Sequence, residues 1–394
     1  MASEQRHDVL IIGGGNGGLS AAAHLLRRGC RDVGLIEPAE QHVYKPLQHY
    51  VGTGIASERE LSRPQASLIP EGVRWYRSAA VAVDPERRAV RCADGTEVRG
   101  GDLIVAPGAR IDWSRLPGAE RALAEGTAVT TFVDDLLPRT RQRLDALDRG
   151  RAVFQVHEQP ASGRETAFKP LLISCDRWRA RGVLDRIEVV LVHEGARLHP
   201  VAAIEAEIRR HLDDYGIDVR LGTRIRSIDG DAVELEGPAG ETTLQADLLH
   251  LHPPYAAPAF LAESGLDDAS SGGFAAVDPE TLRHRRHSRV WAVGDGADLG
   301  DARTGGALRE QVKTVVENIR RSRAGQPLER YDGYTVAPIA TARRSLSFGE
   351  YDRALRVRRS LPVPDEIRSR LVWHVLDRYG LPQVYWHRIL TGRL

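Results

Sequence analysis

The chain has 394 residues, 42% of them hydrophobic and 28% charged, so it is long enough for two or three domains and has the composition of a water-soluble globular protein. Its 55 Lys and Arg residues nearly balance its 54 Asp and Glu residues, which excludes a strong field that would attract nucleic acid or an anionic bilayer. No apolar run approaches the ~20 residues of a membrane-spanning helix, and small molecules are therefore the expected partners.

The N-terminus and the cysteines narrow the class further. The first residues contain no apolar segment of the kind found in secretion signals, so we expect a cytoplasmic location. The only cysteines are Cys30, Cys92 and Cys175, which lie far apart and lack the spacing of a zinc site. Neither a disulfide framework nor a metal site is predicted.

A strand, a glycine-rich turn and a helix are predicted in succession near the N-terminus. Residues 7–12 (HDVLII) form an apolar run of strand length, and residues 19–26 (LSAAAHLL) have the composition of a helix. Gly13 permits the tight turn, Gly15 lets the backbone approach a pyrophosphate, and Gly18 allows the helix to pack closely on the strand. The phosphates would lie at the positive end of the helix.

The second predicted strand, residues 32–37 (DVGLIE), completes this nucleotide-binding unit. Its last residue, Glu37, follows the glycines by about 20 residues, the separation at which an acid binds a ribose hydroxyl. The alternative is a fortuitous glycine turn with a surface Glu, and the four elements in register argue against it. Glu37 is therefore predicted to bind the adenosine ribose.

Two later segments resemble motifs of the two-dinucleotide-domain flavoproteins and indicate FAD. Residues 102–109 (DLIVAPGA) resemble their ATG-type strand and turn, with Pro107 in place of the usual Thr. Residues 289–295 (RVWAVGD) resemble their second flavin motif, in which a strand delivers an Asp to the ribitol chain. A helix cap is the ordinary alternative for that Asp. The cofactor-binding residues implied by the two motifs are Ala106, Gly108, Gly294 and Asp295.

A second nucleotide-binding unit is expected near residue 150, but its glycines are missing. The predicted strand 152–156 is followed by residues 157–169, which contain one glycine and one proline, so no pyrophosphate cradle can form there. Helices are predicted over 170–181 and 202–215, and strands over 187–192 and 217–221, the alternation of a parallel sheet. We predict a second Rossmann-like domain without a nucleotide site, which disfavours direct reduction by NADH or NADPH.

These patterns predict an α/β fold with two Rossmann-like domains of the glutathione-reductase-like type. Residues 1–115 and 276–325 would form the FAD-binding domain, and residues 116–275 the second domain. Residues 326–394 would form a small C-terminal capping or interface region.

Short motifs along almost the whole chain resemble the sulfide:quinone oxidoreductase family, and more closely its mitochondrial-like branch. The matching segments are 37–38, 42–46, 51–54, 250–254, 277–286, 294–295, 303–307 with Gln311, 331–335 and 381–386. The resemblance implies the same fold and a bound FAD.

The same resemblance implies that the redox cysteines of the family are absent. In that family two cysteines carry sulfane sulfur beside the flavin, and a thiolate is needed for this step because it is a strong nucleophile that can hold a persulfide. The family registers place Gly163 and Ala337 at those two positions. Cys175, in the helix after the first of them, is the nearest remaining thiol, and we interpret all three cysteines as ordinary residues.

Other residues are candidates for flavin chemistry. Arg303, where the family has a Lys, and Thr304 precede a predicted helix whose positive end would stabilise a reduced flavin; a surface Arg beside a structural helix is the alternative. Candidates for proton transfer are His157, Lys169, Tyr44 and Lys45, although a structural role is the more common one for such residues.

The C-terminus departs from the family pattern. Family members extend into amphipathic helices that contact the bilayer, whereas this chain stops at Leu394. A helix is predicted over 367–378, which could form a weak membrane contact. We favour the alternatives that it caps the flavin domain or pairs two subunits.

The leading hypothesis is an FAD-dependent oxidoreductase that oxidises a small organic substrate without cysteines, with dioxygen or a quinone as acceptor. The alternatives are a sulfide or thiol:quinone oxidoreductase that uses an external thiol, a non-catalytic flavin-binding protein and an NAD(P)H dehydrogenase.

Overall fold

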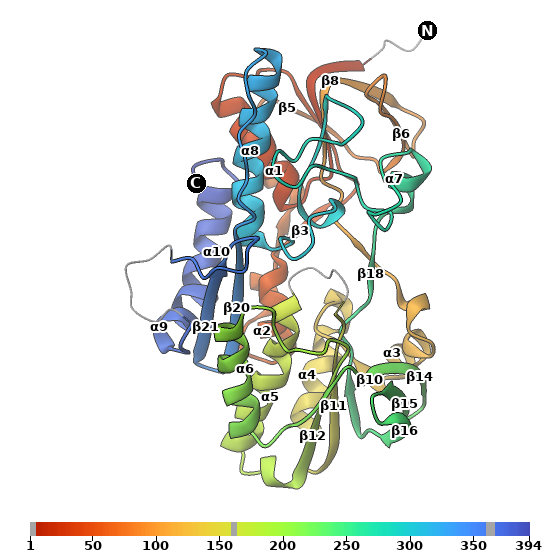
Figure 1. Ribbon diagram of the computed structural model, residues 1–394, viewed down its shortest axis with the longest axis vertical. Helices are drawn as coiled ribbons and strands as arrows, with labels where there is room; N and C mark the ends of the chain where they lie inside the picture. Colours follow the sequence, from red (N-terminus) through yellow and green to blue (C-terminus); the bar gives the residue numbers. More distant parts are fainter. Residues whose placement is uncertain (1–4, 159–163, 360–366) are drawn as a thin grey trace.

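A mixed sheet and a parallel sheet, each flanked by helices, form an α/β fold in the computed structural model (Figure 1), as the sequence predicts. The structure describes residues 5–158, 164–359 and 367–394. The first sheet lies in the upper half of Figure 1 and the second in the lower half, and the chain returns from the second to the first before its C-terminal region.

The first sheet is built around β1, Gln5–Ile12, which pairs in parallel with β2 on one side and β8 on the other. The other strands of this sheet and their neighbours are β2 (Val33–Ile36), β5 (Val73–Tyr76), β6 (Ala80–Asp84), β7 (Ala89–Cys92), β8 (Glu97–Val105) and β19 (Val290–Ala292). The hairpin β6–β7 pairs with the start of β8, and β19 pairs in parallel with its end. A strand from far along the chain thus completes the first sheet.

Two helices cover one side of this sheet. They are α1 (Asn16–Arg27) and α8 (Gly305–Arg323). The side of α1 that meets the strands carries Gly17, Gly18, Ala21 and Ala22, all buried, and these small residues let the helix approach closely. Val9 to Ile12 are buried on both faces of the sheet, as expected for a parallel strand enclosed by other elements.

The second sheet consists of five parallel strands in the order β10-β17-β11-β12-β13. They are β10 (Ala128–Val129), β17 (Leu248–His250), β11 (Gly150–Val156), β12 (Ile187–His193) and β13 (Asp218–Leu221). The helices that accompany them are α3 (Ala119–Glu125), α4 (Leu137–Ala146), α5 (Phe168–Ala180) and α6 (Ala202–Asp214). The predicted helices and strands of this region are confirmed to within two residues at each end.

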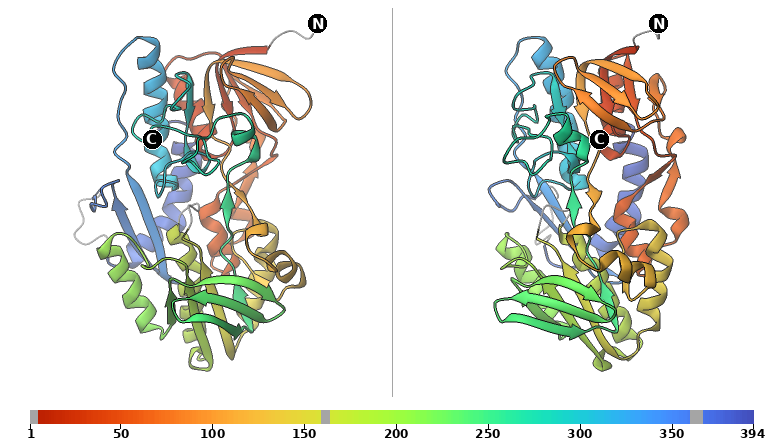
Figure 2. Two further views of the ribbon diagram at one scale, coloured as in Figure 1. Left: turned by 45° about the vertical axis from the view of Figure 1, so that its right-hand side comes forward. Right: turned by 90° about the vertical axis from the view of Figure 1, so that its right-hand side faces the viewer.

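A small antiparallel sheet lies beside the second parallel sheet, as Figure 2 shows in green. Its strands are β14 (Arg224–Asp229), β15 (Ala232–Gly237) and β16 (Gly240–Gln245). Ile225, Val233 and Leu244 join the core on this face of the parallel sheet. The remaining short elements are α2 (Gln48–Gly52), α7 (Ala259–Glu263), β3 (Gln41–Val43), β4 (Ser62–Pro64), β9 (Arg110–Ile111) and β18 (Tyr255–Ala256).

The C-terminal region starts with the hairpin β20–β21 (Thr335–Ala342 and Ser345–Tyr351) and ends in a continuous helical run. The run consists of α9 (Leu371–Val375), a π-helical turn (Leu376–Gly380), α10 (Leu381–Val384) and a second π-helical turn (Tyr385–Ile389). The prediction of a helix over 367–378 is therefore wrong at both ends, because the helical run starts at Leu371 and continues to Ile389. Arg370 exchanges backbone hydrogen bonds of 3.0 and 3.2 Å with Leu346 of the hairpin, which holds the preceding residues extended.

The end of the chain packs on the first Rossmann unit. Arg27 of α1 donates from Nε to the backbone oxygen of Thr391 at 2.7 Å, and a Cβ on Gly392 would lie 2.9 Å from the backbone of Ala23. The last residues of the chain thus contact α1, and the capping role of the C-terminal region stays a prediction.

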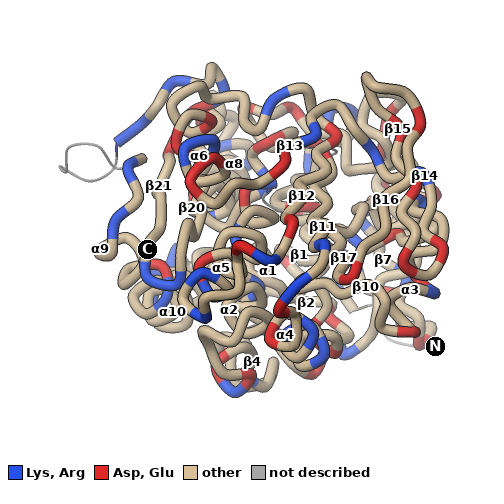
Figure 3. Tube along the Cα trace, turned by 90° about the horizontal axis from the view of Figure 1, so that it is seen from below, with Lys and Arg blue, Asp and Glu red and all other residues tan. Residues whose placement is uncertain are grey.

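Positively and negatively charged residues are interspersed along the Cα trace in Figure 3, in keeping with the near-zero net charge of the sequence. Within the described ranges, no helix combines the length and apolar character needed to cross a membrane.

Candidate functional site

The carboxyl ends of four neighbouring strands of the first sheet, β2, β1, β8 and β19, meet at the N-terminus of α1. Gly13 donates its N–H to the backbone oxygen of Ile36 at 2.8 Å, and Ala106 donates to Ile12 at 2.8 Å, so the turns after the strands are held in register. In open α/β sheets this edge is where ligands bind. The predicted cofactor residues at this edge are Gly13, Gly15, Gly18, Glu37, Ala106, Gly108, Gly294 and Asp295.

The three glycines of the first turn have separate physical roles. Gly13 has φ +96°, and a Cβ there would lie 2.2 Å from the backbone oxygen of Ala106. A Cβ on Gly18 would lie 1.7 Å from the backbone oxygen of Gly13. Gly15 is the N-cap residue of α1 and a Cβ there would meet nothing within 4 Å. The turn therefore exposes the helix N-terminus to open space.

Glu37 lies at the end of β2 and is fixed by the backbone around it. Its Oε2 accepts from the N–H of Gly14 at 2.5 Å and its Oε1 accepts from the N–H of Ala39 at 2.7 Å. The carboxylate is half-buried beside the glycine turn, which is the position predicted for a ribose ligand.

The turns after β8 and β19 lie against each other. Gly108 and Gly294 have φ values of +75° and +70°, and a Cβ on Gly296 would lie 2.9 Å from Cδ of Pro107. Gln311 of α8 accepts from the N–H of Gly294 at 3.0 Å through Oε1. Asp295 is half-buried in this turn and is not the residue that caps it.

The predicted flavin-facing residues Arg303 and Thr304 lie at the start of α8. Thr304 is the N-cap residue, and its Oγ1 accepts from the N–H of Ala307 at 3.2 Å. Arg303 is only 3% exposed; its guanidinium lies over the ring of Phe274 at 3.9 Å, and Nε donates to the backbone oxygen of Ala297 at 3.1 Å. Burial lowers the pKa of Arg303, and nearby carboxylates oppose this effect. A buried cation therefore stands at the positive end of α8.

These residues fit an FAD. The N-terminus of α1 can face a pyrophosphate because the first N–H groups of a helix lack intrahelical partners, and Glu37 can accept from ribose hydroxyls. In the described part of the chain no cluster of His, Cys, Asp or Glu has the geometry to hold a metal ion.

Two of the proton-transfer candidates, Lys169 and Tyr44, lie against the C-terminal helical run. Lys169 is completely buried, and its Nζ donates to Asp377 Oδ2 at 3.1 Å. The hydroxyl of Tyr50 donates to the same oxygen at 2.7 Å. Tyr44 packs on the ring of Tyr385 with centroids 4.4 Å apart. Burial, with Asp377 second, raises the pKa of Tyr44 well above its usual value.

The other two candidates, His157 and Lys45, make no contact with Asp377 that the structure records. His157 follows β11, and its Nδ1 lies 2.5 Å from Glu194 Oε1. Burial alone would raise the pKa of Glu194, but the hydrogen bond and charge of His157 outweigh it, so the pKa is lowered. Lys45 is exposed at the start of a short 3-10 turn. Lys169 and Tyr44 therefore lie near Asp377, whereas His157 pairs with Glu194 and Lys45, next to Tyr44 in the chain, is exposed.

Comparison with known proteins identifies the family. The sequence model of the pyridine nucleotide-disulphide oxidoreductases matches residues 7–322. The chain belongs to this family. Within it the chain is a homologue of the sulfide:quinone oxidoreductases: the mitochondrial enzyme of Dictyostelium discoideum is 30% identical, with 98% of this chain and 86% of that protein covered. The mitochondrial enzyme of Mus musculus is 26% identical, with 99% and 88% covered. The fold is shared with the Aquifex aeolicus sulfide:quinone oxidoreductase structure, with a TM-score of 0.84, 16% identity, and 98% and 92% of the two chains covered.

The positions that the family resemblance assigns to redox cysteines differ in what the structure describes. Gly163 lies outside the described residues. Ala337 lies in β20, fully buried, and its neighbour Val336 contacts the start of α8, since a Cβ on Gly306 would lie 2.7 Å from Val336 Cγ2. Because successive side chains of a strand point to opposite faces, the side chain of Ala337 faces the core of the second sheet and not α8.

The three cysteines of this family member are free and suited to packing. Cys175 is a residue of α5 that is fully buried in the core of the second sheet, and burial raises the pKa of its thiol strongly. Burial raises the pKa of Cys92 to about 11 and also raises that of Cys30. All three are therefore protonated near pH 7, and a protonated thiol is a poor nucleophile.

Several polar residues at the site escaped the sequence analysis. Asp377 and Tyr50 could not be connected because they are far apart in sequence, although they share a hydrogen bond. Glu194 did carry a signal: it follows an apolar strand, as Glu37 does. His49 and His250, the latter in the matching segment 250–254, both lie within hydrogen-bonding distance of Thr131 Oγ1, at 3.0 and 3.1 Å, a contact that the sequence did not indicate.

Proposed function

We propose that the chain is an FAD-dependent oxidoreductase that oxidises a small organic substrate without a cysteine pair and uses dioxygen or a quinone as acceptor. The observation that carries this proposal is Ala337, fully buried in β20 within the core of the second sheet, at the position where the family resemblance predicts a thiol. Alanine can neither attack sulfur nor hold it.

The residues that would hold FAD are those at the carboxyl edge of the first sheet. Gly15 leaves room for the pyrophosphate at the N-terminus of α1, Glu37 would accept from the ribose, and Asp295 would bind the ribitol chain. When bound, FAD would supply the two-electron chemistry, accepting a hydride from the substrate and passing the electrons to the acceptor.

Two features of the chain would support that chemistry. Arg303 and the N-terminus of α8 place positive charge where a reduced flavin needs it. The pair of His157 and Glu194, with Nδ1 2.5 Å from the carboxylate, is the candidate for proton transfer because the carboxylate orients the imidazole. Lys169, by contrast, is enclosed by Asp377 and Tyr50, so we assign it a positioning role for the C-terminal run.

The test is anaerobic absorbance spectroscopy of the FAD-loaded protein with separate additions of small alcohols and acids, NADH, NADPH and sulfide. We expect bleaching of the flavin by an organic substrate and slow or no bleaching by NADH. A protein that takes up no FAD even after reconstitution would overturn the proposal. Reduction by dithionite alone would favour a non-catalytic flavin-binding protein.

A second candidate, a sulfide or thiol:quinone oxidoreductase that uses an external thiol, is favoured by the similarity to a sulfide:quinone oxidoreductase over 98% of the chain. Turnover of sulfide with a short-chain quinone, dependent on added glutathione, would support it. If sulfide gives neither turnover nor bleaching with any thiol, this candidate fails.

A further inference from the structure

A pocket of about 510 Å³ lies at the carboxyl edge of the second sheet. Residues that follow four consecutive strands line it: Pro254 after β17, His157 after β11, Glu194 after β12 and Gly222 after β13. Arg115 and the β14–β15 hairpin form the remaining wall. The volume is in the range of small-molecule sites, and the location is the ligand-binding edge of a parallel sheet.

The carboxylates of this pocket are already paired. Glu194 Oε1 lies 2.5 Å from His157 Nδ1, and its Oε2 accepts from the N–H of Glu158 at 3.2 Å. Glu236 Oε2 accepts from Arg224 at 3.2 Å through Nε and at 2.8 Å through Nη2. Neither carboxylate is left to attract a cationic ligand.

The hydrogen-bond donors of the pocket are not used up. Arg115 forms no ion pair with any residue that the structure describes, and its Nη1 donates only to the backbone oxygen of Tyr255, at 3.2 Å. A guanidinium carries five N–H groups, so Arg115 retains several donors, and Arg224 retains Nη1. The side chain of His157 is only 10% exposed, and its Nε2 is buried without a hydrogen-bond partner in the described structure.

We propose that this pocket binds a small organic anion through its carboxylate, with Arg115 and Arg224 as the main donors and His157 as a third polar contact. A planar guanidinium matches a carboxylate by forming two parallel hydrogen bonds. This binding site goes beyond the proposed oxidation and does not depend on it.

A dinucleotide is the wrong occupant for this pocket. In the first unit the acid after the second strand lies beside a glycine turn that leaves space for a pyrophosphate. In the second unit the corresponding acid, Glu194, bonds to His157, and His157 and Glu158 follow the first strand in place of a glycine turn. A compact anion needs no such cradle.

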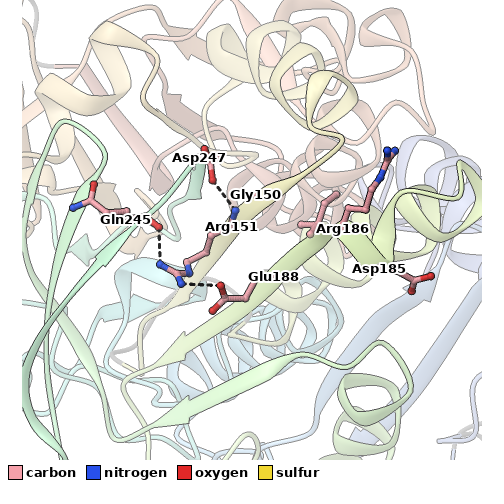
Figure 4. Close-up of a pocket in the computed structure, with 8 residues that line it drawn as sticks. Gly150, Arg151, Asp185, Arg186, Glu188, Gln245 and Asp247 are labelled. Carbon is pink, nitrogen blue, oxygen red and sulfur yellow. Dashed lines mark hydrogen bonds and ion pairs between the residues drawn. The ribbon is translucent and has the colours of Figure 1, made fainter.

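The pocket at the opposite end of the same strands provides a contrast (Figure 4). There Arg151 pairs with Glu188 at 2.7 Å and donates to the backbone oxygen of Gln245 at 3.1 Å, while its N–H donates to Asp247 at 2.7 Å. The guanidinium of Arg151 in this pocket is thus already in an ion pair with Glu188. Only the carboxyl-edge pocket combines a cation without an ion pair with a buried imidazole nitrogen that lacks a partner.

The test is calorimetric titration of the purified full-length protein with malonate at fixed ionic strength, with 1,3-propanediol as the uncharged analogue. We expect malonate to bind and propanediol not to bind. Arg115→Gln should weaken malonate binding at least tenfold, and Arg224→Gln should weaken it less. Arg121→Gln is the matched control, because Arg121 is an exposed arginine outside the pocket that pairs with Asp229.

Two results would overturn the proposal: no heat with malonate in the wild type, or equal affinity in the wild type and Arg115→Gln. Circular dichroism and FAD content, unchanged in Arg115→Gln, establish that the variant is folded. Because binding is measured without turnover, the outcome is independent of whether the oxidation proposed above occurs. NADH binding that Arg115→Gln abolishes while malonate fails to bind would assign the pocket to a nucleotide instead.

Discussion

The two β-α-β units of this chain, β1-α1-β2 and β11-α5-β12, share a scaffold but differ at the edge where ligands bind. In each unit an acid follows the second strand and accepts from the N–H two positions after the first strand. The distance is 2.5 Å from Gly14 to Glu37 and 3.2 Å from Glu158 to Glu194. The backbone geometry of the unit is therefore retained in both.

The side chains at that edge make the difference. In the first unit Gly15 leaves open space at the start of α1. In the second, His157 binds the acid, and the first turn of α5 contains Lys169, buried against Asp377 of the C-terminal run. One edge is thus open to a nucleotide, while at the other the acid and the start of the helix already bond to groups of the protein. The fold thus supplies a ligand-binding edge, and the local sequence decides which ligand that edge can bind.

Filling the open edge should have the largest effect. Gly15 has φ −70° and a Cβ there meets nothing, so Gly15→Val can fold but places its side chain where the pyrophosphate would lie. We expect FAD affinity to fall by about a thousandfold, about 4 kcal/mol, measured by fluorescence titration of the apoprotein. His157→Val in the other unit is the control and should leave FAD affinity unchanged. Tight FAD binding by Gly15→Val would show that the first edge is not the nucleotide site.

Breaking the buried ion pair between Lys169 and Asp377 should lower stability instead. Asp377→Ala leaves the ammonium of the fully buried Lys169 without its carboxylate, which should lower the free energy of unfolding by about 3 kcal/mol. Thermal unfolding measures this loss. Lys169→Met combined with Asp377→Leu removes both charges and should recover most of it. If the single and double variants are equally unstable, the loss arises from packing and not from an unpaired charge.

The two acids should respond differently to the same change. Glu37→Gln removes a charged acceptor for the ribose and should weaken FAD binding by about 2 kcal/mol, roughly 30-fold. Glu194→Gln should leave FAD affinity as it is, because that acid binds His157. Equal effects of the two variants in the same titration would contradict the assignment of FAD to the first unit alone.

Buried histidines of the second sheet should make the stability of the protein depend on pH. Burial lowers the pKa of His250 to about 3 and that of His193 to about 4, whereas histidine in the unfolded chain titrates near ~6.5. The unfolded state therefore binds more protons below that pH, so stability should fall as pH drops from ~6.5 towards 4, by about 1.4 kcal/mol per pH unit for each such group. Melting temperatures from pH 7 to pH 5 measure the slope. His250→Asn should flatten it, and an unchanged slope would mean that His250 does not titrate on unfolding.

Local sequence was sufficient to predict the first unit and the α/β class. The positions of Gly13, Gly15, Gly18 and Glu37 follow from turn geometry within one unit, where every partner is close in sequence. Strands β11, β12 and β13 and helices α5 and α6 of the second sheet were predicted for the same reason, from their own periodicity, whereas β10 and β17 were not predicted. The family resemblance added the expectation for Ala337, which lies fully buried in β20.

Only the tertiary structure decided which polar groups meet. Tyr50 and Asp377 are 327 residues apart in the chain but share a hydrogen bond, and Arg370 pairs with β21, so that the last helical run begins at Leu371. Burial also turned Lys169 from an apparent catalytic base into half of an enclosed ion pair. The physical reason is that hydrogen-bond partners and desolvation are set by packing between distant segments, whereas a glycine turn and its acid are set by the spacing of neighbouring residues.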